Sequence, residues 1–237
     1  MLFSKLSEQI VTSLQLSAPP IALAFMDEPP AGVSVPTVPV PSACAFWVQA
    51  ERQLFFAPAN LHENCPIGML ALGFPMSDQV KSTLNEFVSM MCNVSYLGKA
   101  EPPLIPSTKK SKNGILYGPL AQFPILPDLS LMWANSRQAM ILEEALGAVC
   151  WNTLNRLEAF GRPSCAALAS AMNQSRSTVS LGCSGMRTFT SVSDDLLLIS
   201  IPSPHLAFLS ERLGATIRSN ETMLEFYRQH QRQFSAV

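Results

Sequence analysis

The stretch CAFWVQAERQLFFAPANLHENCPIG, residues 44–68, holds the pattern from which the fold can be predicted. It begins with a cysteine at the start of a short helix, continues into the apolar strand QLFFA, and ends on a second cysteine followed by Pro-Ile-Gly. A short apolar run with prolines on both sides, residues 21–26, precedes it and predicts a buried strand. These two cysteines could form a metal or catalytic site only if another part of the chain supplies partner residues.

A second unit of the same form occurs farther along the chain. An apolar run, residues 129–134, precedes the helix CAALASA, residues 165–171, which is followed by the strand STVSL and then by GCSG. Both helices read Cys-Ala, four further residues and Ala, and both lead through a strand to a second cysteine with a glycine close behind it. Self-similarity of this kind indicates an internal duplication, with repeats at about 20–75 and 128–190. A pseudo-twofold axis would then relate the two halves.

The rest of the chain predicts strands and helices in mixed order. Ser77 begins the clearest helix, whose apolar face is made by Val80, Leu84, Phe87, Val88 and Met91. Ser42 and Asn220 are expected to open two other helices. The predicted helices are 2–16, 44–51, 77–98, 136–149, 161–172, 205–213 and 221–234. The predicted strands are 21–26, 52–60, 114–120, 129–134, 177–183 and 187–202, the last interrupted by a turn at SDD, residues 193–195. We therefore predict one domain, residues 1–237, of the α/β (α+β) class, with a mixed β-sheet and flanking helices.

Composition excludes several classes of protein. The chain has 237 residues, of which 48% are hydrophobic, enough for a globular core. A net charge of −1 predicts no binding to nucleic acid or to an anionic membrane, and the basic run STKKSKNG is expected to be a solvated loop. No apolar run approaches the ~20 residues of a membrane helix, and the amphipathic start does not have the form of a signal peptide. We therefore expect a cytoplasmic protein whose six cysteines are not a disulfide framework.

Several blocks of the sequence resemble a known family. The blocks SACAFW, HENCPIG, GRPSCAAL and SLGCSGMRTFT, together with PPIALAFMDEPP and DLSLMWANSRQAM, are similar to the domain of unknown function 169 family, from about residue 15 to residue 235. The resemblance implies a bacterial or archaeal cytoplasmic protein and implies no activity. It also implies that Cys44, Cys65, Cys165 and Cys183 belong to the family's signature, whereas Cys92 and Cys150 do not. The sequence has CSGM where a further polar or cysteine residue would follow the glycine, so a fifth ligand is not expected.

The four paired cysteines predict a metal centre. Cys44, Cys65, Cys165 and Cys183 could supply four thiolates, which suit an iron-sulfur cluster or zinc. Because the ligands come singly from four places, and not from a C-x2-C pair, the larger iron-sulfur cluster is the first choice, and zinc or haem ranks below it. Cys44 and Cys165 are also expected at helix N-termini, where the helix dipole would lower the thiol pKa.

Two other interpretations stay open. The cysteines could be small buried residues at tight turns, in which case they would lie apart. The protein could instead bind a small molecule, or act as a thiol-dependent enzyme through one cysteine such as Cys65 or Cys183, with the others structural. A thiol enzyme would need one cysteine in a cleft beside a base, whereas a cluster needs all four sulfurs near one point.

Three further side chains are candidates for contact with a bound group. His62 could be a ligand, a proton donor near Cys65, or a surface loop residue. Arg162 and Arg187 flank Cys165 and Cys183 and could bind an anionic substrate or tune a metal centre. The alternative for both arginines is a structural salt bridge, with Asp194 among the candidate partners. The partner is expected to be a small molecule or a redox protein, and the sequence leaves open whether two copies form a homodimer.

Overall fold

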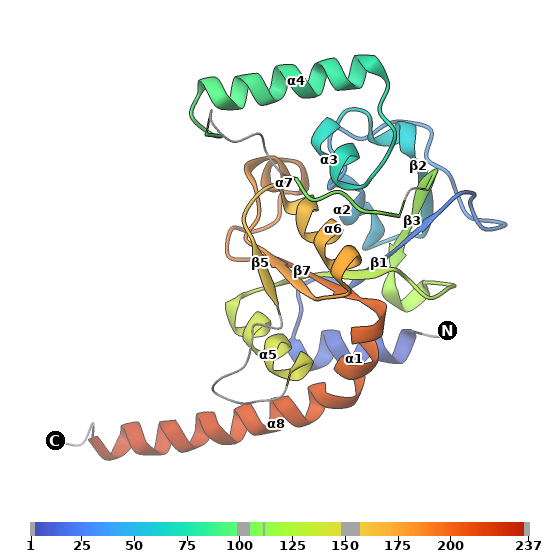
Figure 1. The fold of residues 1–237 in the computed structure, drawn as a ribbon. Coiled ribbons are helices and arrows are strands. Elements are labelled where there is room, and N and C mark those ends of the chain that lie inside the picture. The colour runs from blue at the N-terminus through green and yellow to red at the C-terminus, as the bar shows by residue number, and fades with distance from the viewer. Residues whose placement is uncertain (1–2, 99–104, 111, 148–156, 235–237) are drawn as a thin grey trace.

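The computed structural model describes residues 3–98, 105–110, 112–147 and 157–234. Within these ranges, seven strands form one sheet in the order β2-β3-β1-β4-β7-β6-β5 (Figure 1). Neighbouring strands are antiparallel except β5 and β6, which are parallel, so the predicted mixed sheet is confirmed. The strands are β1 (Ile21–Met26), β2 (Phe55–Pro58), β3 (Gly114–Pro119), β4 (Leu129–Ala134), β5 (Glu158–Phe160), β6 (Thr178–Ser180) and β7 (Leu197–Pro202).

Helices cover both faces of the sheet, which makes three layers (Figure 1). One face packs against α1 (Ser4–Leu14), α5 (Ser136–Leu146) and α8 (Ser203–Phe234). The other packs against α2 (Ala45–Ala50), α3 (Pro66–Ala71), α6 (Ser164–Gln174) and α7 (Ser184–Thr190). The helix α4 (Asp78–Asn93) lies outside this second layer, beyond α3. Short 3-10 helices follow β2 and β3, at Ala59–His62 and Leu120–Gln122.

Two hydrophobic cores explain why the strands are apolar almost throughout. Successive side chains of a strand point to opposite faces of the sheet. In β1, Leu23 and Phe25 belong to the core under α2, α3, α6 and α7, whereas Ala22 and Ala24 belong to the core under α1, α5 and α8. A strand that is covered on both faces needs apolar residues at nearly every position, which is why β1, β3 and β4 are largely apolar. The exception in β4 is Ser130, whose buried hydroxyl donates to the Ile21 carbonyl at 3.0 Å.

The strand order is symmetric about the central β1–β4 pair. Exchanging β1 with β4, β2 with β6 and β3 with β7 reverses the order of these six strands in the sheet and keeps their order along the chain. In chain order, α2 and α3 flank β2 just as α6 and α7 flank β6. An isolated parallel bridge between Ser34 and Phe55 lies beside β2, as the parallel strand β5 lies beside β6. The internal duplication stays a prediction, and this symmetry is what it would produce.

The first part of the strand predicted at 187–202 is wrong, because Ser184–Thr190 forms the helix α7. Threonine and phenylalanine favour strands, but tertiary context overrides that preference here. The helix begins where the backbone N–H of Met186 donates to Cys183 Sγ at 3.4 Å. At its other end the Thr190 hydroxyl donates to the Met186 carbonyl at 2.7 Å. The predicted strand begins only at Leu197.

The two predicted C-terminal helices are one continuous helix, α8, so the expected break at Asn220 is wrong. The Asn220 amide does not cap a new helix; it donates to the Thr216 carbonyl at 3.1 Å and to the Glu144 carboxylate on α5. Asparagine is more common at helix ends than in helix interiors. Here the two hydrogen bonds satisfy its side chain inside a helix. No helix in the described ranges combines the length and the hydropathy of a membrane span.

Candidate functional site: a pocket lined by four cysteines

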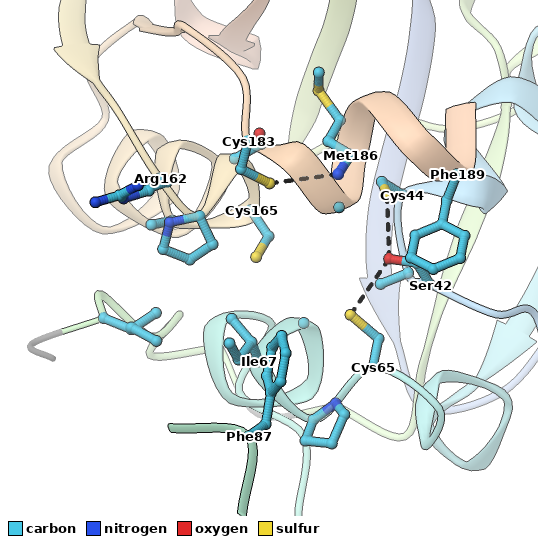
Figure 2. A pocket seen from close by; sticks show the side chains of 18 of the residues that line it. Ser42, Cys44, Cys65, Ile67, Phe87, Arg162, Cys165, Cys183, Met186 and Phe189 are labelled. Atoms are coloured by element: carbon cyan, nitrogen blue, oxygen red, sulfur yellow. Dashed lines mark hydrogen bonds between the residues drawn. The ribbon is translucent and has the colours of Figure 1, made fainter. Parts of the chain in front are cut away.

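A cavity of about 730 Å³ lies on the side of the sheet that α2, α3, α6 and α7 cover. Cys44, Cys65, Cys165 and Cys183 all line it, and Figure 2 shows the four side chains in one pocket. Each lies where a helix begins: the first, second and fourth are the N-cap residues of α2, α3 and α7, and Cys165 is the second residue of α6. The fold therefore brings the four predicted cysteines to one cavity. Their role as metal ligands stays a prediction.

Ser42 connects two of the four thiols. Its Oγ lies 3.2 Å from Cys44 Sγ and 3.5 Å from Cys65 Sγ (Figure 2). A hydroxyl has one proton, so donation to Cys65 leaves its oxygen free to accept the Cys44 S–H. The side chain expected to cap α2 therefore joins the cysteines of two helices, while Cys44 itself is the N-cap residue.

The expected lowering of the thiol pKa at Cys44 and Cys165 is wrong. The pKa of Cys44 is raised to about 11, mainly by burial and to a smaller extent by the negative charge that Cys65 or Cys183 would carry. Burial also raises the pKa of Cys165 well above its ordinary value. The negative charges that Cys65, Cys183 and Cys44 would carry raise this pKa too, by a smaller amount. Removal from water outweighs the helix dipole at both positions.

The geometry of the thiols bears on which group they could hold. Among the described residues, no three His, Cys, Asp or Glu side chains stand close enough together to bind one metal ion. A zinc ion with Zn–S bonds of about 2.3 Å needs all of its thiolates around a single point. An iron-sulfur cluster consists of several iron and sulfide ions, so its thiolate ligands surround a larger volume. Apart from the four cysteines, the cavity wall offers few ligand atoms to a metal.

His62 lies in the core and does not line the pocket. Its ring lies 4.9 Å from the ring of Phe46 and 4.8 Å from that of Phe74. Nδ1 is 3.1 Å from the Pro58 carbonyl, which can only accept, so Nδ1 carries the proton. Nε2 then accepts from the Tyr117 hydroxyl at 3.1 Å. Both ring nitrogens are used within the core, and the surface-loop interpretation is wrong.

The two arginines have different places. Arg162 lines the mouth of the pocket, with its guanidinium 3.7 Å from the centre of the Tyr96 ring and an N–H donating to the Tyr96 carbonyl at 2.7 Å. Arg187 is not part of the cavity wall. It donates to the carbonyls of Leu181 and Ser193 and lies 3.5 Å from the Asp194 carboxylate. The alternative of a structural salt bridge is the one observed for Arg187.

The rest of the wall is mostly apolar. α3, α4 and α7 contribute Ile67, Phe87 and Phe189, which Figure 2 shows around the sulfurs. The predicted helix at α4 and its Ser77 cap are confirmed, but of its five expected apolar residues only Val80 and Met91 are buried. Phe87 is 41% exposed because its side chain lies at the cavity and not in the core. The sequence analysis did not predict this wall. The apolar face of α4, a helix that does not pack on the sheet, was the signal that could have indicated it.

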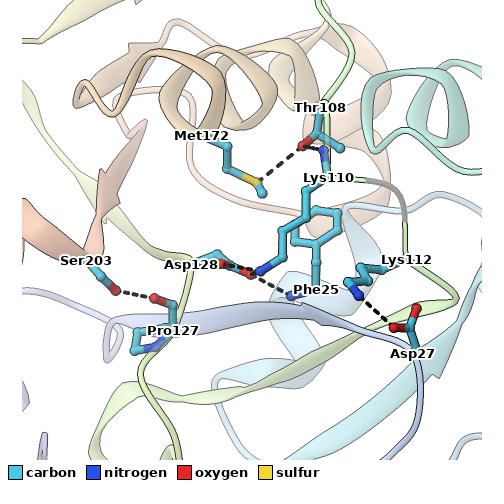
Figure 3. Close-up of polar contacts among 9 residues, drawn as sticks. All are labelled: Phe25, Asp27, Thr108, Lys110, Lys112, Pro127, Asp128, Met172 and Ser203. Atoms are coloured by element: carbon cyan, nitrogen blue, oxygen red, sulfur yellow. Dashed lines mark hydrogen bonds and ion pairs between the residues drawn. The ribbon is translucent and has the colours of Figure 1, made fainter.

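The segment 105–110 forms another part of the wall through Ile105 and Pro106, and its far end is fixed to the sheet. Lys110 Nζ lies 2.7 Å from both carboxylate oxygens of Asp128, and Asp128 also accepts the backbone N–H of Phe25 at 2.7 Å (Figure 3). Lys112 pairs with Asp27. The basic run is therefore more than the solvated loop that was expected, since Lys110 pairs with Asp128 next to β4 and Lys112 pairs with Asp27 next to β1.

Comparisons with known proteins give one match. The family model of domain of unknown function 169, described as "Uncharacterised ArCR", matches residues 9–212, close to the expected span of about 15–235. The matched region contains the four pocket cysteines and ends within α8. No curated protein and no solved structure matches the chain.

Proposed function

The chain belongs to the domain of unknown function 169 family, and from its pocket we propose a redox or sulfur-handling protein with a four-cysteine iron-sulfur centre. One observation carries the proposal. Cys44, Cys65, Cys165 and Cys183 come from four separate segments and line the same cavity. Cysteines kept only as small core residues have no reason to gather in this way.

The residues fit such a group. Four thiolates are the usual ligand set of an iron-sulfur cluster, and dispersed ligands suit its size. Metal binding requires the thiols to lose their protons, and the metal would then compensate the charge that burial disfavours at Cys44 and Cys165. When bound, a cluster would supply the capacity to accept or donate an electron. The apolar wall would keep water from it and so influence its potential.

The symmetry of the sheet supports a shared centre. Cys44 and Cys65 begin the helices on either side of β2, and Cys165 and Cys183 begin those on either side of β6. Each half of the sheet therefore contributes two cysteines from equivalent positions. Zinc and haem stay weaker candidates, because a zinc ion needs its thiolates closer together than a cluster does and Cys65-Pro66 is the one haem-like feature.

A second candidate function is small-molecule binding, with or without thiol chemistry. A cavity of about 730 Å³ with apolar walls has the size of a ligand site. Thiol catalysis is the weaker form of this alternative. The base expected beside Cys65 was His62, and its ring nitrogens interact with Pro58 and Tyr117 instead.

The proposal includes a cytoplasmic location and a redox partner. The described cysteines are free thiols, which suits a reducing compartment. A homodimer stays a prediction, and native mass spectrometry of the purified protein would test it.

Anaerobic purification with assays for iron, zinc and acid-labile sulfide tests the proposed function. We expect a brown protein that contains iron and sulfide. Changing any one of the four pocket cysteines to serine should lower the iron content. Cys92→Ser is the matched control, because Cys92 is a partly exposed free thiol that does not line the cavity. A colourless protein without iron after anaerobic handling would contradict the proposal.

A further inference from the structure

We infer that the pocket binds an apolar organic anion, with the anionic group at Arg162 in the mouth and the apolar body against Phe87 and Phe189. The inference rests on the proposed function, because it names the class of substrate that would meet the cysteine centre. In Figure 2 the cysteines lie between Arg162 and Phe189, so a ligand that spans the pocket passes the sulfurs.

The described wall of the pocket carries a positive charge. Among the described residues of the cavity wall, Arg162 is the one with a formal charge, and none is an Asp or Glu. Its guanidinium stacks on Tyr96 and gives one N–H to a carbonyl, and neither partner neutralises it. Within the described part of the chain, the ion pairs do not include Arg162. A planar guanidinium with free donors at the mouth of an apolar cavity suits a carboxylate or sulfonate.

The walls define the rest of the ligand. Phe87 is 41% exposed and Phe189 is 43% exposed, from two helices that belong to different parts of the chain. Large apolar side chains that gather around a cavity mark a binding site for an apolar partner. Ile67 and Met91 belong to the same cavity wall. An ion such as phosphate would leave these walls uncovered, so the ligand needs an apolar body.

Two fluorescent probes test the ligand class. 8-Anilinonaphthalene-1-sulfonate is an apolar anion, and N-phenyl-1-naphthylamine has the same apolar body without the charge. We expect both to bind the protein, and Arg162→Gln to weaken the affinity for the anion about tenfold at low salt while that for the neutral probe stays within twofold. Arg218→Gln on α8 is the matched control, because it removes an exposed arginine that is not part of the cavity wall. Phe189→Ala should lower the affinity of the protein for both probes.

Three outcomes would overturn the inference. Wild type and Arg162→Gln could bind the anionic probe with equal affinity, or Arg162→Gln could lose affinity for both probes to the same extent. In the third outcome, Phe189→Ala would bind both probes as tightly as wild type. Iron and sulfide are measured on the same samples. Arg162-dependent binding without iron supports the ligand class and rejects the cluster. Iron and sulfide without Arg162-dependent binding leave the cluster standing and reject the ligand class.

Discussion

The Ser42 hydroxyl lies within hydrogen-bond distance of two pocket sulfurs, at 3.2 Å for Cys44 and 3.5 Å for Cys65. A hydroxyl that donates to a ligand sulfur favours the reduced, more negative state of a cluster and so raises its reduction potential. Ser42→Ala should therefore lower the potential of the proposed centre by roughly 40 mV, the equivalent of one hydrogen bond of about 1 kcal/mol. A potentiometric titration followed by absorbance measures the shift. Ser219→Ala on the exposed part of α8 should leave the potential unchanged, and a higher potential in Ser42→Ala would refute the argument.

His62 makes stability depend on pH. Burial lowers the pKa of His62 from 6.5 to about 4. As pH falls below about 6.5 the unfolded chain binds a proton at this residue, and the folded protein does so only near pH 4. The contribution of neutral His62 is therefore fully present above pH 6.5 and is lost as pH falls toward 4, by roughly 3 kcal/mol in total.

The comparison with His62→Gln isolates this effect from other groups that titrate in the same range. Denaturant unfolding at several pH values between 4 and 7 should show a steeper loss of stability in wild type than in His62→Gln. His230→Gln, at an exposed histidine on α8, should keep the wild-type slope. Parallel slopes for wild type and His62→Gln would mean that the buried ring does not control the pH response.

At the scale of elements, α3 must come close to the start of α2 for Cys65 to reach the pocket, and Gly68 permits it. A Cβ on Gly68 would lie 2.8 Å from both Ala43 Cβ and Cys65 Sγ. Gly68→Ala should lower the free energy of unfolding by about 1–3 kcal/mol and also lower the iron content, because it displaces a ligand. At Gly214 on α8 a Cβ would meet only Arg218 Nη1, at 3.5 Å. Gly214→Ala should therefore stabilise the protein, by about 0.5–1 kcal/mol. Full iron content in Gly68→Ala would contradict the close approach.

The connection between the pocket wall and the sheet depends on Asp128. Its carboxylate accepts from Lys110 and from the Phe25 backbone N–H, and it is only 25% exposed. Asp128→Asn should lower the free energy of unfolding by about 1–2 kcal/mol, since it keeps one acceptor and loses the charge. Glu225→Gln, which breaks the exposed pair with Arg232, should cost less than about 0.5 kcal/mol. Chemical denaturation measures both, and equal small effects would show that the Asp128 pair does not hold the segment.

Elements with strong apolar patterns were predictable, and those shaped by tertiary contacts were not. The strands at Ile21–Met26 and Leu129–Ala134 match their predictions because both faces are covered and all positions except Ser130 are apolar. α7 was mistaken for a strand because its threonines bond backbone carbonyls within the helix, at 2.9 Å for Thr188, which residue preferences do not reveal. The short strand Glu158–Phe160 was missed because three residues paired with β6 leave no periodic pattern.

At the scale of the whole molecule, the repeated Cys-Ala pattern singled out the four cysteines that line one cavity, while the duplication inferred from the same pattern stays a prediction. The same reasoning placed Arg162 beside Cys165, and Arg162 does line the pocket. It could not place His62 or Arg187, since closeness along the chain does not decide which way a side chain points. His62 bonds to the Tyr117 hydroxyl in the core, and Arg187 donates to the carbonyl of Leu181, just before α7.

The central claim concerns one point in space, so the most direct measurement locates iron there. Crystals of anaerobically purified protein, measured at the iron absorption edge, would give an anomalous difference map. The account predicts a strong peak inside the cavity, surrounded by the sulfurs of Cys44, Cys65, Cys165 and Cys183. A map without an iron peak in that cavity, with the four thiols unligated, would contradict the account.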